Sequence, residues 1–207
     1  MSLTDDHLLP NFFHPYKGQF QIPLDIYSDI AECWPGFNSD PEEIAQRPAR
    51  LFRYACLSFR VAAERQVSHG AAFGDFVKFG ELIEYRPHHW QVQAAWDMPD
   101  QHPHMKAMVI SDAVRDERLL RGEVLTIIDI MRGRLTHKAT RAHIDAPILL
   151  FSFMDTCVRV LEANIDGEQF TIRATRLYDF KAEEDPNFSL SIFFDKWWMG
   201  QAADLSY

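Results

Sequence analysis

Residues 146–180 of this 207-residue chain, APILLFSFMDTCVRVLEANIDGEQFTIRATRLYDF, decide its fold. They predict a three-strand meander, because hydrophobic and polar residues alternate on both sides of the Asp166-Gly167 dipeptide, which favours a tight hairpin turn. Residues 148–154 are apolar at almost every position. This run predicts a central strand that is covered on both faces.

A two-residue turn at Asp166-Gly167 would fix the register of the hairpin. The expected cross-strand pairs are Ile165 with Glu168, Ala163 with Phe170, and Leu161 with Ile172. In this register one face of the hairpin is apolar and the opposite face carries polar residues such as Glu162 and Arg173. The agreement between turn and alternation supports the hairpin.

Helical periodicity dominates the sequence before the meander. The longest regular segment is 105–138, whose apolar stripe consists of Leu120, Val124, Ile127, Ile128, Met131 and Leu135. Gly122 and Gly133 weaken this helix locally or allow another element to approach closely. Residues 190–198 predict a closing helix.

These patterns predict an α+β fold, with a helical N-terminal part packed on a small, mainly antiparallel C-terminal sheet. Residues 1–21 have little periodicity and predict an extended N-terminal arm. Residues 22–207 predict a single α+β domain, because the length suits one hydrophobic core.

Composition constrains the partners and the compartment. The net charge of −9 disfavours nucleic acid, whose phosphates an acidic surface repels. Three widely spaced cysteines without a CxxC pair favour a reducing compartment. The sequence has neither a signal-peptide pattern nor an apolar run that could span a bilayer. We therefore expect an intracellular protein of the cytoplasm or nucleus, without a membrane partner.

Residues 86–104 form the strongest candidate for a functional segment. Three prolines predict mainly a loop, with a short strand around 90–96, and long loops within compact domains often carry function. His88-His89 and His102 to His104 flank two aspartates, but their spacing matches no metal motif, so we expect no metal and no cofactor. Aromatic and histidine side chains can instead bind a ligand. The candidate ligand-binding residues are Trp90, Trp96, His88, His104 and Glu123.

Carboxylates offer an alternative site. Asp112, Asp116 and Glu123 would share one face of a helix over 105–138, where they could act as acid and base or bind magnesium. Nearby arginines favour a solvated, ion-paired face instead. No catalytic sequence motif is present in the chain, so the catalytic residues stay unassigned.

Two stretches resemble known sequences. LLRGEVLTIIDIMRGRL (Leu119–Leu135) and the meander are similar to segments of an uncharacterised family of filamentous-fungal proteins. The element order also resembles fungal domains distantly related to the PD-(D/E)xK nuclease fold. That family requires a (D/E)xK triplet on strands before the helix, whereas Asp179-x-Lys181 lies downstream of the meander. The resemblance therefore implies a degenerate scaffold rather than an active nuclease.

The leading functional expectation is a non-catalytic binding or scaffold domain, which recognises a protein or small molecule and self-associates as a homodimer. The alternative is an enzyme acting on a small-molecule or nucleic-acid substrate near residues 88–129. Such an enzyme would be either a metal-dependent hydrolase or a specialised-metabolism enzyme with an apolar pocket. Whether the chain is an enzyme is left open by the sequence.

Overall fold

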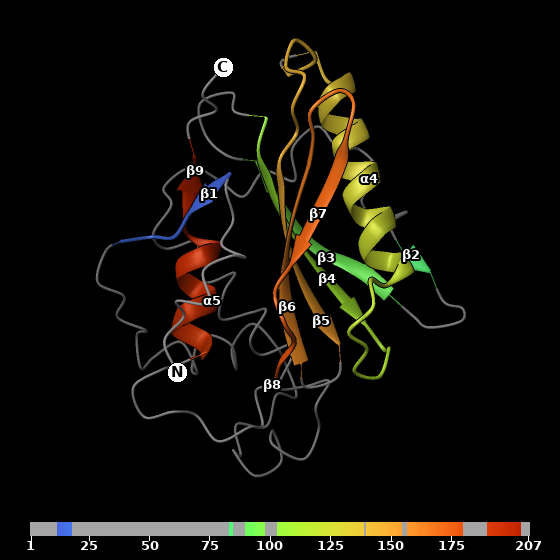
Figure 1. The fold of residues 1–207 in the computed structure, drawn as a ribbon, viewed down its shortest axis with the longest axis vertical. Coiled ribbons are helices and arrows are strands. Elements are labelled where there is room, and N and C mark those ends of the chain that lie inside the picture. The colour runs from blue at the N-terminus through green and yellow to red at the C-terminus, as the bar shows by residue number, and fades with distance from the viewer. Residues whose placement is uncertain are drawn as a thin grey trace, which may run out of the picture.

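The computed structural model describes residues 12–17, 83–84, 90–97, 103–138, 140–154, 157–179 and 190–203. These residues contain nine strands and two helices, and most of the strands belong to one central sheet (Figure 1). The two helices lie on opposite sides of that sheet.

The central sheet has seven strands and the order β2-β3-β4-β5-β6-β7, with β8 paired to β6 beyond the end of β7. Its strands are β2 (Ile83–Glu84), β3 (Trp90–Asp97), β4 (Met105–Ser111), β5 (Ile148–Met154), β6 (Cys157–Ile165), β7 (Phe170–Ala174) and β8 (Tyr178–Asp179). Only β4 and β5 run parallel, and every other neighbouring pair is antiparallel.

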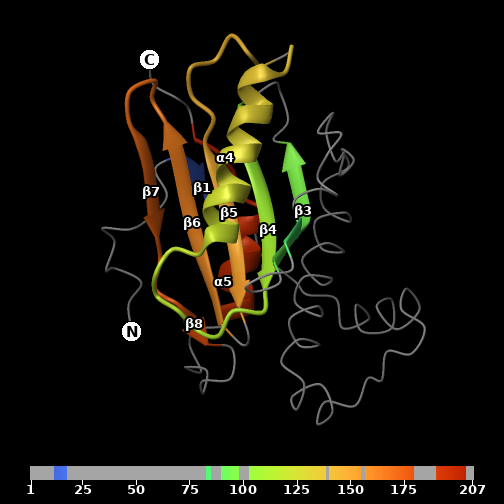
Figure 2. The same ribbon diagram turned by 90° about the vertical axis from the view of Figure 1, so that its right-hand side faces the viewer.

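Helix α4 (Arg121–Thr136) connects the two parallel strands and covers one face of the sheet. Figure 2 shows α4 in front of the middle strands of the sheet, with β3 on one side and β6 and β7 on the other. A parallel pair needs such a crossover, because a tight turn can join only antiparallel neighbours. Ile127, Ile130 and Met131 of α4 are buried against the sheet.

The opposite face of the sheet is covered by α5 (Leu190–Trp198) and by two short strands. Phe194, Trp197 and Trp198 of α5 pack on Phe151 and its buried neighbours. Strand β1 (Phe13–His14) pairs with β9 (Gln201–Ala202), so segments from near both ends of the chain lie side by side (Figure 1).

The predicted fold class is wrong in its balance of helix and sheet. Strands predominate over helices among the described residues, and the sheet already begins at β2 rather than being confined to the C-terminal part. No helical N-terminal part is found among the residues that the structure describes, where 12–17 contain a strand. The helices expected between residues 24 and 85 lie outside the described residues except at Ile83–Glu84, where the predicted end of the last helix is strand β2 instead.

The long helix predicted over 105–138 is also wrong in its first half. Residues 105–111 form strand β4, residues 112–120 form a loop, and only Arg121–Thr136 are helical. Apolar residues occur at nearly every position of β4, and such a run is compatible with a buried strand as much as with a helix. The short strand expected around 90–96 is confirmed as β3, which pairs with β4 through seven of its eight residues, with an irregularity between Val92 and Ala94.

The meander prediction holds for its strands and faces but not for its register. The pairs are Ile165 with Phe170 and Ala163 with Ile172, two positions away from the predicted pairs. A shift of two residues leaves each side chain on its predicted face. The turn spans four residues, because Asp166 N donates to Gln169 O at 3.3 Å. The central, fully buried position of β5 and the helix over 190–198 are confirmed.

Candidate functional site

The loop of residues 112–120 leaves the end of β4 and leads into α4, and it is the candidate recognition loop. Local contacts shape it: Ala113 N donates to Ser111 Oγ at 3.1 Å, and Arg118 N donates to Asp116 Oδ1 at 2.9 Å. Side chains of Ser and Asp commonly order turns by accepting such backbone hydrogen bonds. The chain therefore enters α4 along a defined path.

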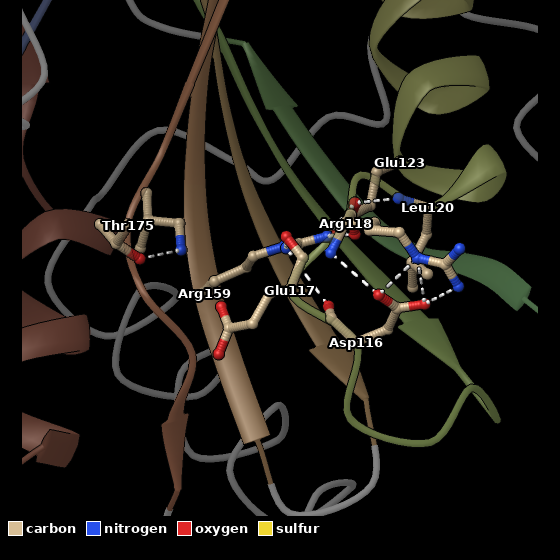
Figure 3. A network of polar contacts seen from close by, with 8 residues as sticks. Asp116, Glu117, Arg118, Leu120, Glu123, Arg159 and Thr175 are labelled. Atoms are coloured by element: carbon tan, nitrogen blue, oxygen red, sulfur yellow. Dashed lines mark hydrogen bonds and ion pairs between the residues drawn. The ribbon is translucent and has the colours of Figure 1, made fainter.

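The side chain of Arg159 extends from β6 to this loop and anchors it (Figure 3). Its side chain is almost fully buried on the α4 face of the sheet. Its terminal nitrogens donate to three consecutive backbone carbonyls of the loop, which are Asp116 O at 3.4 Å, Glu117 O at 3.0 Å and Arg118 O at 2.7 Å. One guanidinium thus binds the backbone of three successive loop residues.

Glu123, in the first turn of α4, completes the coordination of Arg159. Its two carboxylate oxygens accept from Arg159 Nε at 2.8 Å and from Nη2 at 2.5 Å, which is the bidentate geometry of strong arginine–carboxylate pairs. Glu123 also accepts from Leu120 N at 2.7 Å and so caps the start of the helix. A carboxylate at a helix N-terminus is further favoured by the helix dipole.

The Arg159–Glu123 pair leaves no donor of the guanidinium unused. Arg159 has five N–H groups, and two bond to the carboxylate while three bond to loop carbonyls. The charges of Arg159 and Glu123 compensate each other, and the remaining N–H groups of Arg159 bond to backbone carbonyls. The arrangement is therefore suited to holding a loop rigid rather than to binding an anion.

The outer side of the loop carries both apolar and charged side chains. Val114 is 77% exposed and Leu119 is 47% exposed, which is unusual for aliphatic side chains on an ordered loop. Arg118, 87% exposed, forms a 2.7 Å ion pair with Asp116. Hydrogen bonding to Arg118 lowers the pKa of Asp116 to about 2, so this carboxylate is ionised at neutral pH. The loop presents two apolar side chains within a charged rim.

Lys106 forms a second buried polar centre, on the opposite face of the sheet. Its Nζ donates to Trp198 O at 2.7 Å and to Gly200 O at 2.5 Å, at the C-terminal end of α5. Burial lowers the pKa of Lys106 to about 7. Cations are favourable at helix C-termini, so this lysine attaches the segment after α5 to the sheet.

Glu162 attaches the N-terminal segment to the same face. Its Oε2 accepts from Phe12 N at 2.8 Å, and its Oε1 accepts from Arg173 at 3.1 Å. Ala203 N in turn donates to Phe12 O at 2.8 Å. Lys106 and Glu162 thus hold the two terminal segments against the sheet.

The structure places the described members of the predicted site in different surroundings, although Trp90 and Glu123 both adjoin Gly122. Trp90 is buried beneath α4, against Gly122, where an added Cβ would lie 2.6 Å from its ring. Glu123 lies in the Arg159 pair, next to Gly122. His104 is buried against Phe13, with ring centroids 5.3 Å apart. His88 lies outside the described residues, as does the side chain of Trp96.

The β3–β4 pairing shows how far apart these positions are. Trp90 pairs with Ser111, whereas Met105, which follows His104, pairs with Asp97 at the other end of the strands. Seven residues of strand separate those ends, or roughly 20 Å. Trp90 and His104 therefore do not converge on one pocket.

The carboxylates expected to share a helix face are also dispersed. Asp112 and Asp116 lie in the recognition loop, and only Glu123 is helical. Within the described parts of the chain, no group of three or more histidine, cysteine or carboxylate residues is arranged to hold a metal ion. The helices among those parts include none that is both long and apolar enough to cross a membrane.

Sequence reasoning missed Arg159 and Lys106 as the organising residues. Each is a single cation within an otherwise mainly apolar strand. A buried charge requires a partner, so an isolated cation in such a run is the signal that could have identified both. The partner of each is distant in the sequence and cannot be read from the same run.

No protein-family model, curated protein or solved structure matches this chain.

Proposed function

We propose that the chain is a non-catalytic binding domain that recognises a protein partner through the 112–120 loop. The observation that carries this proposal is the contrast between the two sides of the loop. Its backbone is tied to the buried Arg159, while Val114 and Leu119 extend into solvent.

Preorganisation is the physical basis of the proposal. A flexible loop loses conformational entropy when a partner binds, and a loop already held in one conformation loses much less. Exposed aliphatic side chains within a charged rim also match the usual anatomy of protein interfaces. Arg115, Asp116, Glu117 and Arg118 supply that rim and form ion pairs within it.

The binding proposal can be tested by partner capture with matched variants. The double variant Val114→Asp/Leu119→Asp removes both apolar contacts at exposed positions. Ile144→Asp is the control, because Ile144 is 62% exposed but lies on the connection between α4 and β5. Crosslinked extracts of the source cells are analysed by quantitative mass spectrometry for proteins that copurify with each variant.

The expected result is a partner that the wild-type chain and Ile144→Asp retain and that the double variant loses. Arg159→Lys should weaken the binding of the same partner without removing an apolar contact. Lysine lacks the planar guanidinium whose N–H groups bind the loop carbonyls. Retention of the same partners by the double variant would contradict the proposal.

Lys106 favours a second candidate function, an enzyme that acts on a small carbonyl substrate. A lysine with a pKa of about 7 is partly neutral at physiological pH, as an amine nucleophile must be. It lies within the 88–129 region expected for an enzymatic site. The carbonyls of Trp198 and Gly200 occupy the amine, so a substrate would have to displace the segment after α5.

Reductive trapping tests the enzyme candidate. A small aldehyde condenses with a neutral amine, releasing water, and borohydride reduces the imine to a stable secondary amine. Peptide mapping should find preferential labelling of Lys106 over the exposed Lys196 at pH 7 if the amine is reactive. Faster labelling of Lys196 would eliminate this candidate.

We also propose that any relation to the nuclease fold is one of a degenerate scaffold without nuclease activity. Lys106 lies on β4, the strand that precedes α4, but the residue two positions before it, just ahead of the strand, is His104 instead of an acid. We further propose that the protein is located in the cytoplasm or nucleus. The three widely spaced cysteines, of which Cys157 is buried, support a reducing compartment.

A further inference from the structure

Strand β7 is the last strand in the order of the central sheet. Among the described strands it pairs only with β6, so one side of β7 is an edge. Its first residue, Phe170, is 41% exposed, and the other four residues are half-buried. Its sequence FTIRA contains neither proline nor lysine, two of the residues with which proteins commonly protect sheet edges.

The hydrogen bonds that frame the β6–β7 hairpin show which backbone groups face this edge. Thr175 N donates to Val160 O at 2.9 Å at one end, and Asp166 N donates to Gln169 O at 3.3 Å at the other. Both pairs continue the register of the hairpin. In an antiparallel ladder, hydrogen-bonded pairs alternate with pairs whose N–H and C=O groups point away.

Counting residues along β7 from either of these two hydrogen bonds gives the same directions for the backbone groups. Thr171 and Arg173 direct their backbone groups toward β6. The residues that direct their N–H and C=O groups outward are therefore Phe170, Ile172 and Ala174. This set is suited to forming an additional antiparallel ladder.

We propose that a second copy of this chain pairs antiparallel with β7, about a two-fold axis that passes between the two facing Ile172 residues. Ile172 would pair with Ile172 of the partner subunit, and Phe170 with Ala174 of the partner subunit. Because all three outward-facing residues then meet outward-facing residues, about six backbone hydrogen bonds form across the axis. A two-fold axis generates such a self-complementary interface.

Side-chain size and charge favour a second copy in this register. The bulky Phe170 lies opposite the small Ala174 of the partner subunit, and both project from the α4 face. Past the two ends of β7, this register brings Glu168, in the hairpin turn, near Arg176 of the partner subunit, and the symmetry makes this contact twice. Both side chains are exposed in the single chain. Opposite charges at directly facing positions stabilise a strand pair.

The charged residue within β7 does not oppose this pairing. Arg173 projects to the other face of the sheet, where it forms a 3.1 Å ion pair with Glu162. In the proposed register it faces Thr171 of the partner subunit, so no like charges meet. A single added strand buries little surface, so we expect a weak, concentration-dependent dimer.

Sedimentation velocity over a concentration series tests the dimer. The wild-type chain is expected to change from monomer to dimer as its concentration rises to about 1 mM, in line with a weak interface. Ile172→Pro removes an outward N–H that β6 does not use, so it should stay monomeric with an unchanged circular dichroism spectrum. Thr171→Pro is the matched control, which removes an inward N–H and should lower the melting temperature instead.

Charge reversal tests the register even if the proline variant fails to fold. In a homodimer of Glu168→Lys, both contacts join a lysine to an arginine. In a homodimer of Arg176→Glu, both contacts join two glutamates, so like charges meet in either case. Each change should weaken self-association by about tenfold. An equimolar mixture of the two variants should regain association, because both contacts of the heterodimer join opposite charges.

Three outcomes would overturn the proposal: a wild-type chain that stays monomeric, an Ile172→Pro dimer as tight as the wild type, or a mixture that does not regain association. The Val114→Asp/Leu119→Asp variant should dimerise normally, since the recognition loop does not belong to the β7 edge. Failure of the loop proposal and failure of the dimer are therefore distinguishable.

Discussion

Replacing Arg159 with methionine should strongly destabilise the folded protein. Methionine can replace the aliphatic part of the Arg159 side chain, but it is shorter and uncharged and provides none of the five hydrogen bonds. The substitution leaves the buried carboxylate of Glu123 without its cation and three loop carbonyls without their donor.

The magnitude follows from the burial of both partners. Arg159 and Glu123 side chains are each about 1% exposed, so water cannot replace the lost partner without opening the site. Removing one member of such a pair typically costs about 3–5 kcal/mol. For a chain of this size, that loss corresponds to a fall in melting temperature of roughly 6–20 °C.

Urea denaturation measures this loss, with the free energy of unfolding extrapolated to zero urea. Arg118→Met is the matched control, because Arg118 pairs with Asp116 at the surface, where solvent screens the pair, and its removal should leave the stability nearly unchanged. The double variant Arg159→Met/Glu123→Leu removes both buried charges. It should be more stable than Arg159→Met alone, since no uncompensated charge stays buried.

Two results would refute this reasoning. A loss below about 1 kcal/mol for Arg159→Met would mean that Glu123 readily finds water or another partner. A double variant that is no more stable than the single one would mean that the stranded carboxylate is not the source of the loss.

Three further predictions concern other parts of the fold. Gly122→Ala should destabilise the protein by up to about 2 kcal/mol and shift the fluorescence of Trp90, because overpacking against the ring outweighs the gain in helix propensity; unchanged melting and fluorescence would contradict this. Gly167→Ala should cost about 1 kcal/mol in thermal unfolding, because Gly167 has a φ of 91°, whereas an equally stable variant would show that the turn readily changes conformation. The stability of the wild type relative to Lys106→Met should rise by more than about 1 kcal/mol between pH 7 and 9, as urea titrations at both pH values would show. The folded-state pKa of Lys106 is about 7 and its ordinary value is 10.5, so the unfolded chain binds more protons in that range; a constant difference would argue against the lowered pKa.

Part of the architecture follows from local pattern alone. The continuous apolar run of β5 specifies a strand buried on both faces, and the alternation across β6 and β7 specifies which side chains face α4. Those signals are local, because strand periodicity and face assignment depend only on neighbouring residues. The same locality explains the error at residues 105–111, since a short apolar run predicts burial but does not separate strand from helix.

The candidate site is predictable from the sequence only in fragments. Residue type makes Glu123 a binding candidate, and a glutamate at the third helical position does cap the helix, but nothing in its surroundings predicts Arg159. Trp90 is a candidate because of its aromatic ring, and the structure uses that ring to pack against Gly122. Aromatic residues serve cores and binding sites alike, so residue type alone cannot distinguish the two roles.

The sequence by itself determined that β5 is a buried strand, which faces the β6–β7 hairpin presents and where the closing helix lies. The tertiary structure alone decided that Arg159 meets Glu123 across 36 residues, and that Lys106 reaches the carbonyls of Trp198 and Gly200 more than 90 residues away. Those contacts depend on how the sheet is ordered and on which helix covers each face. Buried charges must find partners wherever the fold places them, and that requirement acts through space rather than along the chain.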